Sequence, residues 1–298
     1  MKQTPQTSQS QSLTLKAPAK INLFLKILNR RPDGYHEIES LMQKIALFDI
    51  LHLSRQRDSI SLSCQGRPVP EDRENLVCRA ALAFFSATGI AAGVQIILEK
   101  KIPVAAGLGG GSSDAAAVLY GLNRLFSAGL DLESLMDVGL QLGADVPFFL
   151  QDCSGAVATG IGECIKKVKS ISDSWILLVN PGFEVSTKWA YENFPMTSTS
   201  NPYILARGRK MDMNSQIVPP GLFEELGKDL EAVTINRFPE IGDIKKELKR
   251  TGAVTALMSG SGPTVFGLFS GKEQAQRSFE QFVKEYGDNV FLVRPYIP

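Results

Sequence analysis

Histidine and cysteine are scarce in this sequence, and their scarcity excludes several kinds of site. His36 and His52 are the only histidines among 298 residues. The cysteines stand far apart and form no Cys-x-x-Cys pair: Cys64, Cys78, Cys153 and Cys164. A structural zinc site takes four Cys or His ligands, usually with two of them at short spacing, so we expect no metal site of this kind. We expect free thiols that are buried or partly buried instead.

An excess of charge of one sign is missing as well. Lys and Arg together number 32, and Asp and Glu number 31, so the formal net charge at pH 7 is +1. Proteins that bind nucleic acids through the phosphate backbone normally carry a clear excess of Lys and Arg. We therefore expect a small, diffusible substrate and no nucleic-acid partner.

Long hydrophobic runs are absent too. No stretch reaches the roughly 20 apolar residues that a membrane-spanning helix requires. The first segment, MKQTPQTSQSQS, is polar and lacks the apolar core of a signal peptide. We expect residues 1–12 to be a disordered leader, the protein to be cytoplasmic, and no membrane to be among its partners.

What is present is the composition of a globular protein with a core, with 44% hydrophobic and 21% charged residues. Helical spacing predicts helices over residues 74–88, 115–126, 132–142, 222–235 and 241–249. Strand-like runs stand between them, at residues 45–53, 94–102, 175–179 and 254–269. The chain becomes glycine-rich and strand-like around residues 154–163, so we expect two domains, 13–165 and 166–298.

The first structured segment predicts a strand that carries polar groups on one face. After Pro18, Ile21 and Leu23 begin an apolar face that continues through Leu25 and Ile27, and the opposite face carries Lys20, Asn22, Phe24 and Lys26. Pro18 lacks an N–H donor and is expected to interrupt the strand. The alternation places Lys20 and Asn22 side by side. Residues 31–36 predict a turn in which Gly34 takes positive φ.

The strongest local signal is PVAAGLGGGSSDAAA, between a predicted strand and a predicted helix. Three consecutive glycines allow main-chain N–H groups to approach an anion without interference from side chains. The helix that follows directs the positive end of its dipole to the same place. The hydroxyls of Ser112 and Ser113, with Asp114, are suited to begin the helix, and both hydroxyls can donate to phosphate oxygens. The segment predicts a phosphate-binding loop.

Other glycine-rich loops fail on spacing. A Walker A loop ends in Gly-Lys-Ser/Thr, and no lysine stands between Gly107 and Asp114. The dinucleotide pattern Gly-x-Gly-x-x-Gly needs glycine where Ser112 stands. The hydrolase pattern Gly-x-Ser-x-Gly fails around Ser112 because Asp114 occupies its last place. A loop that merely turns the chain is disfavoured because strand, glycines, serines and helix all agree.

Asp145 and a second glycine-rich segment allow two interpretations each. Asp145 stands between Gly143 and Pro147 beside apolar residues. Such a carboxylate can be partly desolvated and serve as a base or as the partner of a cation, but a turn or cap aspartate has the same sequence signature. The segment SGSGP at residues 259–263 is compatible with an ordinary hairpin turn and with a main chain that closely approaches a ligand.

Together these segments resemble the GHMP kinase superfamily of small-molecule kinases. The phosphate motif Pro-x-x-x-Gly-Leu-Gly-Ser/Gly-Ser-Ser is matched at residues 103–113, with one glycine more than its shortest form. Within the superfamily, the segments APAKINLFL, RPDGYH and GADVPF resemble members that phosphorylate a cytidine-diphosphate-linked methylerythritol. The resemblance runs from about residue 13 to the last strand and is most specific before residue 165.

The resemblance implies roles for individual residues. Lys20 and Asp145 match the catalytic pair, and Asn22, Tyr35 and His36 match positions that line the cytidine and erythritol side. The loop for the phosphates of ATP is matched by Pro103, Val104, Ala105, Ala106, Gly107, Leu108, Gly109, Gly110, Gly111, Ser112 and Ser113. Residues 260–263 match a third family motif. An aromatic residue of the second domain is expected to stack on the cytosine, and Phe183, Trp189 and Tyr191 all remain open.

The resemblance also implies a fold and a reaction. The fold is α+β, with an ATP-binding N-terminal domain like the second domain of ribosomal protein S5 and a ferredoxin-like C-terminal domain. The reaction is ATP-dependent phosphorylation of a hydroxyl of the cytidine diphosphate substrate, with Mg²⁺ expected. A monomer or weak homodimer is expected. The alternatives are a homoserine or mevalonate kinase, a decarboxylase of the superfamily, and a nucleotide-binding module without catalysis.

Overall fold

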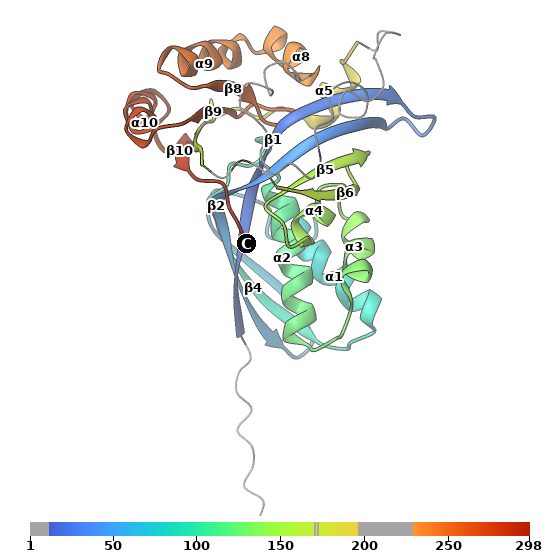
Figure 1. The fold of residues 1–298 in the computed structure, drawn as a ribbon. Helices are drawn as coiled ribbons and strands as arrows, with labels where there is room; N and C mark the ends of the chain where they lie inside the picture. Colours follow the sequence, from blue (N-terminus) through green and yellow to red (C-terminus); the bar gives the residue numbers. More distant parts are fainter. Residues whose placement is uncertain (1–11, 170, 172, 196–228) are drawn as a thin grey trace, which may run out of the picture.

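The computed structural model describes residues 12–169, 171, 173–195 and 229–298, which form two sheets with helices packed against them (Figure 1). The expected leader lies outside these residues except for Ser12, which begins the first strand. A polar, proline-bearing connection that the sequence predicts over residues 197–220 also lies outside them, as does the first part of the helix expected over 222–235. The mixture of helices and strands that the sequence predicts is confirmed.

The first sheet is built around a long antiparallel hairpin. Its six strands are β1 (Ser12–Arg30), β2 (His36–Gln56), β3 (Ile60–Gly66), β4 (Gly93–Lys100), β5 (Gly155–Gly160) and β6 (Cys164–Val168). Their order is β3-β4-β2-β5-β6, and β1 pairs with β2. Gly34 lies in the β1–β2 turn at φ 89°, which confirms the predicted turn. Figure 1 shows the β1–β2 pair running as a curved ribbon from the first sheet to the neighbourhood of α5.

Pro18 does not interrupt β1, which corrects the expectation from the sequence. The strand continues through it, and the register of pairing shifts between Pro18 and Ala19 and again between Asn22 and Phe24. β1 pairs only with β2, and an edge strand with a bulge accommodates proline because no ladder donor is needed there. The second shift also breaks the predicted alternation, since the neighbours Leu23 and Phe24 are both buried in one core.

Helices cover one face of the first sheet. They are α1 (Leu76–Thr88), α2 (Gly110–Leu125), α3 (Leu132–Leu140) and the short α4 (Val146–Leu150). Leu51 and Ile96 of the sheet are buried against Phe84 of α1 and Leu119 of α2. The predicted stop of α1 is confirmed, because Gly89 ends it at φ 66°.

α2 begins earlier than the sequence suggests. Its N-cap is Gly109 at φ 68°, and no side chain caps it. Glycine is a poor helix former, which is why the serines appeared the better start. The close approach to β4 decides the matter: a Cβ on Gly110 would lie 2.9 Å from Ile102 Cγ2 and 3.0 Å from Lys100 Nζ. Only glycine fits there, and the helix therefore starts within the glycine run.

The second sheet holds the C-terminal half. Its strands, all antiparallel and in the order β10-β7-β9-β8, are β7 (Trp175–Val179), β8 (Thr255–Met258), β9 (Val265–Phe269) and β10 (Val290–Val293). The helices of this half are α5 (Thr187–Glu192), α8 (Asp229–Arg237), α9 (Pro239–Arg250) and α10 (Lys272–Tyr286), followed by the 3₁₀ helix η1 (Gly287–Asn289). The predicted strand at residues 175–179 is confirmed without change.

The second sheet is covered on both faces. In β7, Ile176 and Leu178 pack in a core shared with β1 and β2, whereas Leu177 and Val179 pack with α8, α9 and α10. The two halves therefore share a core. The boundary expected near residue 165 falls within β6, which pairs with β5, so we propose that the domains divide between β6 and β7.

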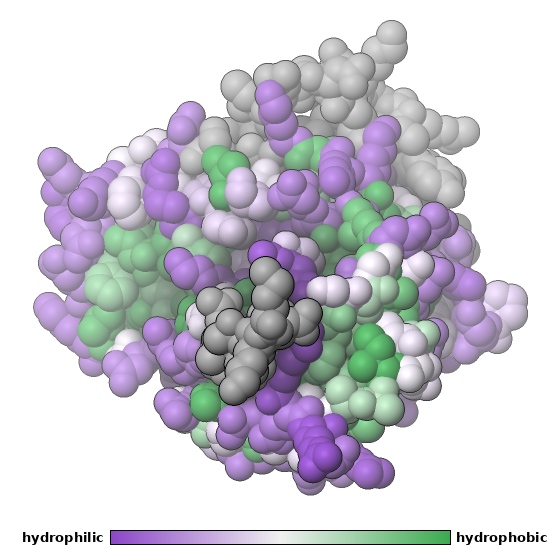
Figure 2. Space-filling model, turned by 90° about the horizontal axis from the view of Figure 1, so that it is seen from below, coloured by the Kyte–Doolittle hydropathy of each residue, from purple (hydrophilic) through white to green (hydrophobic). Residues whose placement is uncertain are grey.

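Among the residues placed by the structure, no helix combines the length and the apolar character needed to cross a bilayer. Figure 2 shows one end of the molecule, where hydrophilic residues surround smaller hydrophobic groups. Exposed apolar residues such as Leu82, Tyr120 and Leu132 lie on different helices, as is ordinary for a folded domain.

Candidate active site

A cavity of about 1150 Å³ is lined by both halves of the chain. Most of the residues singled out in the sequence line it: Lys20, Asn22, Tyr35, His36, Pro103, Val104, Ala105, Ala106, Gly107, Gly109, Gly110, Gly111, Ser112 and Asp145. Leu108 and Ser113 do not. Leu108 is buried in the shared core, and Ser113 is buried with a hydroxyl that has no hydrogen-bond partner among the described residues. The volume suits two ligands lying end to end more than a single drug-sized molecule.

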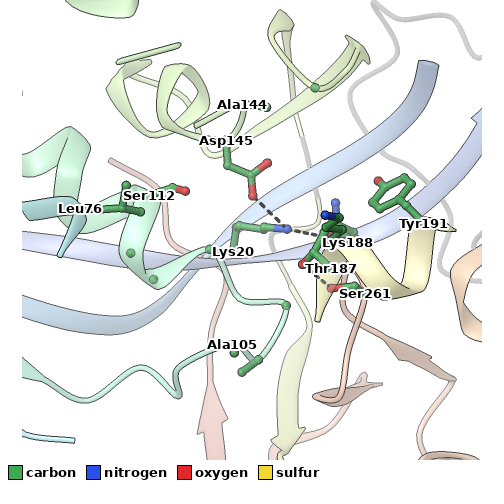
Figure 3. Close-up of a pocket in the computed structure, with 18 of the residues that line it drawn as sticks. Lys20, Leu76, Ala105, Ser112, Ala144, Asp145, Thr187, Lys188, Tyr191 and Ser261 are labelled. Atoms are coloured by element: carbon green, nitrogen blue, oxygen red, sulfur yellow. Dashed lines mark hydrogen bonds and ion pairs between the residues drawn. The ribbon is translucent and has the colours of Figure 1, made fainter. Parts of the chain in front are cut away.

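Lys20 and Asp145 meet in the cavity. Lys20 Nζ lies 3.5 Å from Asp145 Oδ2, and the Lys20 side chain is 6% exposed against 34% for Asp145. Lys20 also donates to Asn22 Oδ1 at 2.6 Å. The ammonium group is therefore held by the protein, while the carboxylate remains accessible from the cavity (Figure 3).

Asn22 is oriented by a chain of hydrogen bonds. Its Nδ2 donates to Ser40 Oγ at 2.8 Å, and Ser40 Oγ donates to the Phe24 carbonyl at 2.8 Å. This assignment leaves Oδ1 of Asn22 directed at Lys20. The register shift between Asn22 and Phe24 helps to position Asn22. It allows Phe24 to enter the core while Asn22 stays beside the cavity.

Asp145 is positioned by the start of a helix that the sequence did not predict. It is the N-cap of α4, with no capping hydrogen bond from its side chain. Pro147 stands in the first turn of α4, where proline is favourable because no N–H is required. The carboxylate is thus available to Lys20, and of the two interpretations of Asp145, a cation's partner fits the geometry.

Lys44 lies at the other end of α4. Its Nζ donates to the Gln151 carbonyl at 2.6 Å and to the Phe149 carbonyl at 3.3 Å. It also lies 5.2 Å from the centre of the Phe148 ring. Burial lowers the pKa of Lys44 to about 8. Lys44 stands just before the strand predicted at residues 45–53, and it gave no signal of this role, since most surface lysines are solvated.

The glycine loop presents main-chain groups to the cavity. Ala105, Gly107 and Gly109 all have left-handed backbone conformations, at φ 48°, 74° and 68°. The first intrahelical bond of α2 runs from Ser113 N–H to the Gly109 carbonyl at 2.9 Å, so the N–H groups just before it lack helical partners. Such groups at a helix N-terminus attract anions, phosphate above all.

The SGSGP segment is both a turn and a wall of the site. It connects β8 to β9, and Gly260 and Ser261 line the cavity. Ser259 Oγ donates to the Gly107 carbonyl at 2.8 Å, and Ser261 Oγ lies 2.9 Å from Thr187 Oγ1. The segment therefore ties the phosphate loop to α5.

Of the three aromatic residues left open by the sequence, Tyr191 is the one that lines the cavity within the described residues. Its ring centre lies 5.4 Å from that of His36. Phe183 stacks on Phe238 at 4.9 Å, and Trp189 meets the same ring at 6.0 Å, so both belong to the core. Burial, together with the nearby Arg30 charge, lowers the pKa of His36.

The Lys20–Asp145 pair separates the cavity into two ends. Figure 3 shows Leu76 and Ser112 on one side of the pair and Thr187 and Tyr191 on the other. Leu76 begins α1 and Ser112 stands in the first turn of α2, whereas Thr187 and Tyr191 belong to α5. His36, beside the β1–β2 turn, contacts Tyr191. A group transferred between two ligands would pass beside the pair.

Several lining residues escaped sequence reasoning. They are Val69, Pro70, Glu74, Asn75, Leu76, Lys100, Asp114, Thr187, Lys188 and Glu192. Most belong to loops and helix starts with no distinctive pattern. The sequence did contain a signal for Lys100 and Asp114. Each is a charged residue at the end of an apolar element, and a charged side chain that is buried there requires a partner of opposite charge.

Metal-ligating residues are not clustered in the part of the chain that the structure places. No group of three His, Cys, Asp or Glu side chains occurs there that could hold an ion. The four cysteines are free thiols; Cys78 is buried, while Cys164 is exposed, against expectation.

Comparison with known proteins shows the family of this chain. The models of the GHMP kinases N terminal domain and the GHMP kinases C terminal domain match residues 75–152 and 212–289. A 4-diphosphocytidyl-2-C-methyl-D-erythritol kinase of Syntrophotalea carbinolica is 47% identical over 94% of this chain and 97% of its own. A crystal structure of a 4-(cytidine 5'-diphospho)-2C-methyl-D-erythritol kinase covers 95% of this chain and 100% of its own, with 34% identity and a TM-score of 0.76.

A more distant structure shows the breadth of the fold. The homoserine kinase of Cytophaga hutchinsonii has a TM-score of 0.71 but only 21% identity, over 98% of this chain and 97% of its own. That likeness concerns the fold alone and confirms the expected two-domain α+β architecture. The 47% identity to the Syntrophotalea carbinolica kinase, which extends over 94% of this chain, identifies the family more specifically. This chain belongs to the GHMP kinases, and within them to the 4-diphosphocytidyl-2-C-methyl-D-erythritol kinase family.

Proposed function

We propose that this enzyme transfers the γ-phosphate of ATP to the 2-hydroxyl of 4-diphosphocytidyl-2-C-methyl-D-erythritol, a step in non-mevalonate isoprenoid biosynthesis. The observation that carries the proposal is the Lys20–Asp145 pair at 3.5 Å. It lies in one cavity with the glycine loop at one end and Tyr35, His36 and Tyr191 at the other. The γ-phosphate of ATP and the hydroxyl that accepts it would thus meet beside this ion pair.

The glycine loop is proposed to hold the phosphates of ATP. The N–H groups at the start of α2 and the helix dipole both favour negative charge there. Ser112 lines the cavity and is suited to donate to a phosphate oxygen. Mg²⁺ is proposed to enter as part of the ATP substrate, held mainly by phosphate oxygens and water, because the described residues offer no ready cage. An ion held in this way would neutralise part of the charge of the phosphates.

The opposite end is proposed to hold the cytidine. Tyr191 and His36 lie close enough for their rings to form one aromatic surface, and aromatic faces bind bases by stacking. The lowered pKa of His36 favours the neutral ring at neutral pH. Tyr35 is 61% exposed at the edge of the cavity, so a ligand there would cover it.

The transfer itself needs little covalent chemistry from the protein. Asp145 accepts the proton of the substrate hydroxyl while that oxygen bonds to the γ-phosphorus, and the bond from this phosphorus to the bridging oxygen breaks to release ADP. Lys20 stabilises negative charge at the attacking oxygen. Most of the acceleration in such reactions comes from positioning and electrostatics. Asn22 contributes by fixing the Lys20 ammonium.

The alternatives differ in the acceptor or in the need for catalysis. A homoserine or mevalonate kinase, or a decarboxylase of the superfamily, would share the phosphate loop. A binding module without catalysis would need neither Lys20 nor Asp145, yet both line the cavity and face one another. The cytoplasmic location and the monomer or weak homodimer remain predictions.

A substrate panel tests the proposal. ADP release is measured with the cytidine diphosphate methylerythritol, with homoserine and with mevalonate as acceptors, each at saturating MgATP. We expect turnover with the first acceptor alone. Turnover with homoserine or mevalonate but not with the cytidine compound would refute the assignment.

A further inference from the structure

A buried ion cluster lies directly behind the phosphate loop. Lys100 Nζ lies 2.5 Å from Asp49 Oδ2 and 2.6 Å from Asp114 Oδ2. All three side chains are almost fully buried. The cluster joins three elements, because Asp49 belongs to β2, Lys100 ends β4 and Asp114 stands near the start of α2.

The cluster reaches both ends of the loop. Asp49 Oδ1 accepts from the N–H groups of Lys101 and Ile102, at 2.5 and 2.9 Å, immediately before the loop begins at Pro103. At the far end, Lys100 Nζ lies 3.0 Å from the position that a Cβ on Gly110 would occupy. The segment between these ends carries the three left-handed residues described above.

The arrangement depends on charge. Asp114 hydrogen-bonds through Oδ2 to Lys100, while its Oδ1 is buried without a hydrogen-bond partner in the described part of the chain. The carboxyl group is therefore held in place chiefly by the ammonium. A buried pair loses far more than a surface pair when one charge is removed, because the other is left uncompensated.

We propose that Asp49, Lys100 and Asp114 form a clamp that fixes the two ends of the phosphate loop, so that Asp114 is a positioning residue for the phosphates of the nucleotide. The inference rests on the proposed nucleotide-binding role of the loop. Although Lys100 and Asp114 also reach the wall of the cavity, the clamp acts by fixing the shape of the loop. A clamp of this kind matters for ligands that carry phosphates and not for the nucleoside.

Binding of ADP and of adenosine, each measured by titration calorimetry at pH 8, where Asp114 is ionised, and without an acceptor, separates these cases. Asp114→Asn keeps the size of the side chain and removes its charge. We expect it to weaken ADP binding about tenfold, since losing a charged hydrogen bond is worth roughly that much or more. Adenosine binding should stay within about twofold. Asp243→Asn, in an exposed ion pair with Lys246 on α9, is the matched control and should change neither.

Equal weakening of ADP and adenosine by Asp114→Asn, or no weakening of ADP, would overturn the clamp. Binding of ADP to the wild-type protein tests the proposed role of the loop. The ratio of the ADP dissociation constants of variant and wild type tests the clamp. Lys100 supplies a second comparison that does not depend on Asp114→Asn folding. Lys100→Arg can bridge both carboxylates and should keep more ADP affinity than Lys100→Met; equal losses would count against the proposal.

Discussion

At the scale of single residues, the site depends on backbone positions that admit no side chain. Gly107 is the clearest case, because it has φ 74° and a Cβ there would lie 2.0 Å from the Ser259 carbonyl oxygen. The contact joins the phosphate loop to the turn of the second sheet. The absence of a side chain at Gly107 is therefore a requirement of the tertiary fold as much as of the proposed phosphate binding.

Gly107→Ala should destabilise the protein by about 2–5 kcal/mol, the sum of a left-handed alanine and a main-chain clash. Urea unfolding measures the loss. Gly89→Ala is the matched control, since Gly89 also has positive φ, at 66°, but has nothing within 4 Å of its Cβ position. It should lose only about 1 kcal/mol. Equal losses would show that the Ser259 contact is unimportant.

Tyr191→Ala should raise the KM for the cytidine substrate about tenfold or more, since stacking on one base is worth roughly 1–3 kcal/mol. The KM for ATP should not change, because Tyr191 lies on the opposite side of the Lys20–Asp145 pair from Ser112 (Figure 3). Tyr191→Phe retains the ring and should stay near wild type. A selective rise in the KM for ATP would contradict the proposed placement of the two substrates.

Asp114 should give stability an unusual dependence on pH. Burial, reinforced by the Asp49 carboxylate and opposed by Lys100, raises the pKa of Asp114 from 3.8 to about 7. Between these values the folded state retains a proton that the unfolded state has lost, so this group's contribution to stability falls as pH rises from about 4 to 7. The neighbouring Cys64 thiol, with its pKa raised to about 11, stays uncharged in this window.

Urea unfolding of wild type and Asp114→Asn at pH 5 and pH 8 measures this effect. The variant lacks the titrating group, so its free energy of unfolding relative to wild type should increase from pH 5 to pH 8. A relative stability that is flat or decreases with pH would mean that Asp114 does not keep its proton in the folded state.

At the scale of elements, the short helix α4 is the one on which the position of Asp145 depends. Asp145 stands at its N-terminus, and Lys44 contacts its C-terminus. The Lys44 ammonium satisfies two carbonyls where the helix ends. A five-residue helix has little stability of its own. The direction of Asp145 therefore depends on contacts at the far end of α4.

Lys44→Met retains the apolar stem and removes the donor. We expect a loss of about 1–3 kcal/mol in the free energy of unfolding, because buried carbonyls lose their partner. The kcat should fall several-fold through misplacement of Asp145, with the KM for ATP unchanged. Lys167→Met changes a nearby but exposed lysine of β6 and should leave both quantities unaltered. An unchanged kcat for Lys44→Met would show that Lys44 does not position Asp145 through α4.

Elements also show what the sequence could predict. The strand at 175–179 and the stop of α1 at Gly89 follow from local patterns and are confirmed. The bulges of β1 and the start of α2 at Gly110 depend on tertiary contacts, such as the contact of Gly110 with Ile102. Local periodicity and propensity carry no information about such contacts.

At the scale of the whole molecule, the active site is a consequence of two sheets that share a core. β1 and β2 belong to the first sheet and also pack against β7, so the glycine loop and α5 are brought to opposite ends of one cavity. The pairing of Lys20 with Asp145 followed from family motifs. The selection of Tyr191 over Phe183 and Trp189, and the Lys100 cluster, required the tertiary arrangement.

The central claim is that Asp145, held beside Lys20, accepts the proton of the substrate hydroxyl during transfer. A single-turnover experiment with enzyme in excess of MgATP and saturating cytidine substrate isolates that step. Asp145→Asn should slow phosphoryl transfer by about two orders of magnitude or more while ADP affinity remains at the wild-type value. A transfer rate near that of wild type, with the same ADP affinity, would contradict the account.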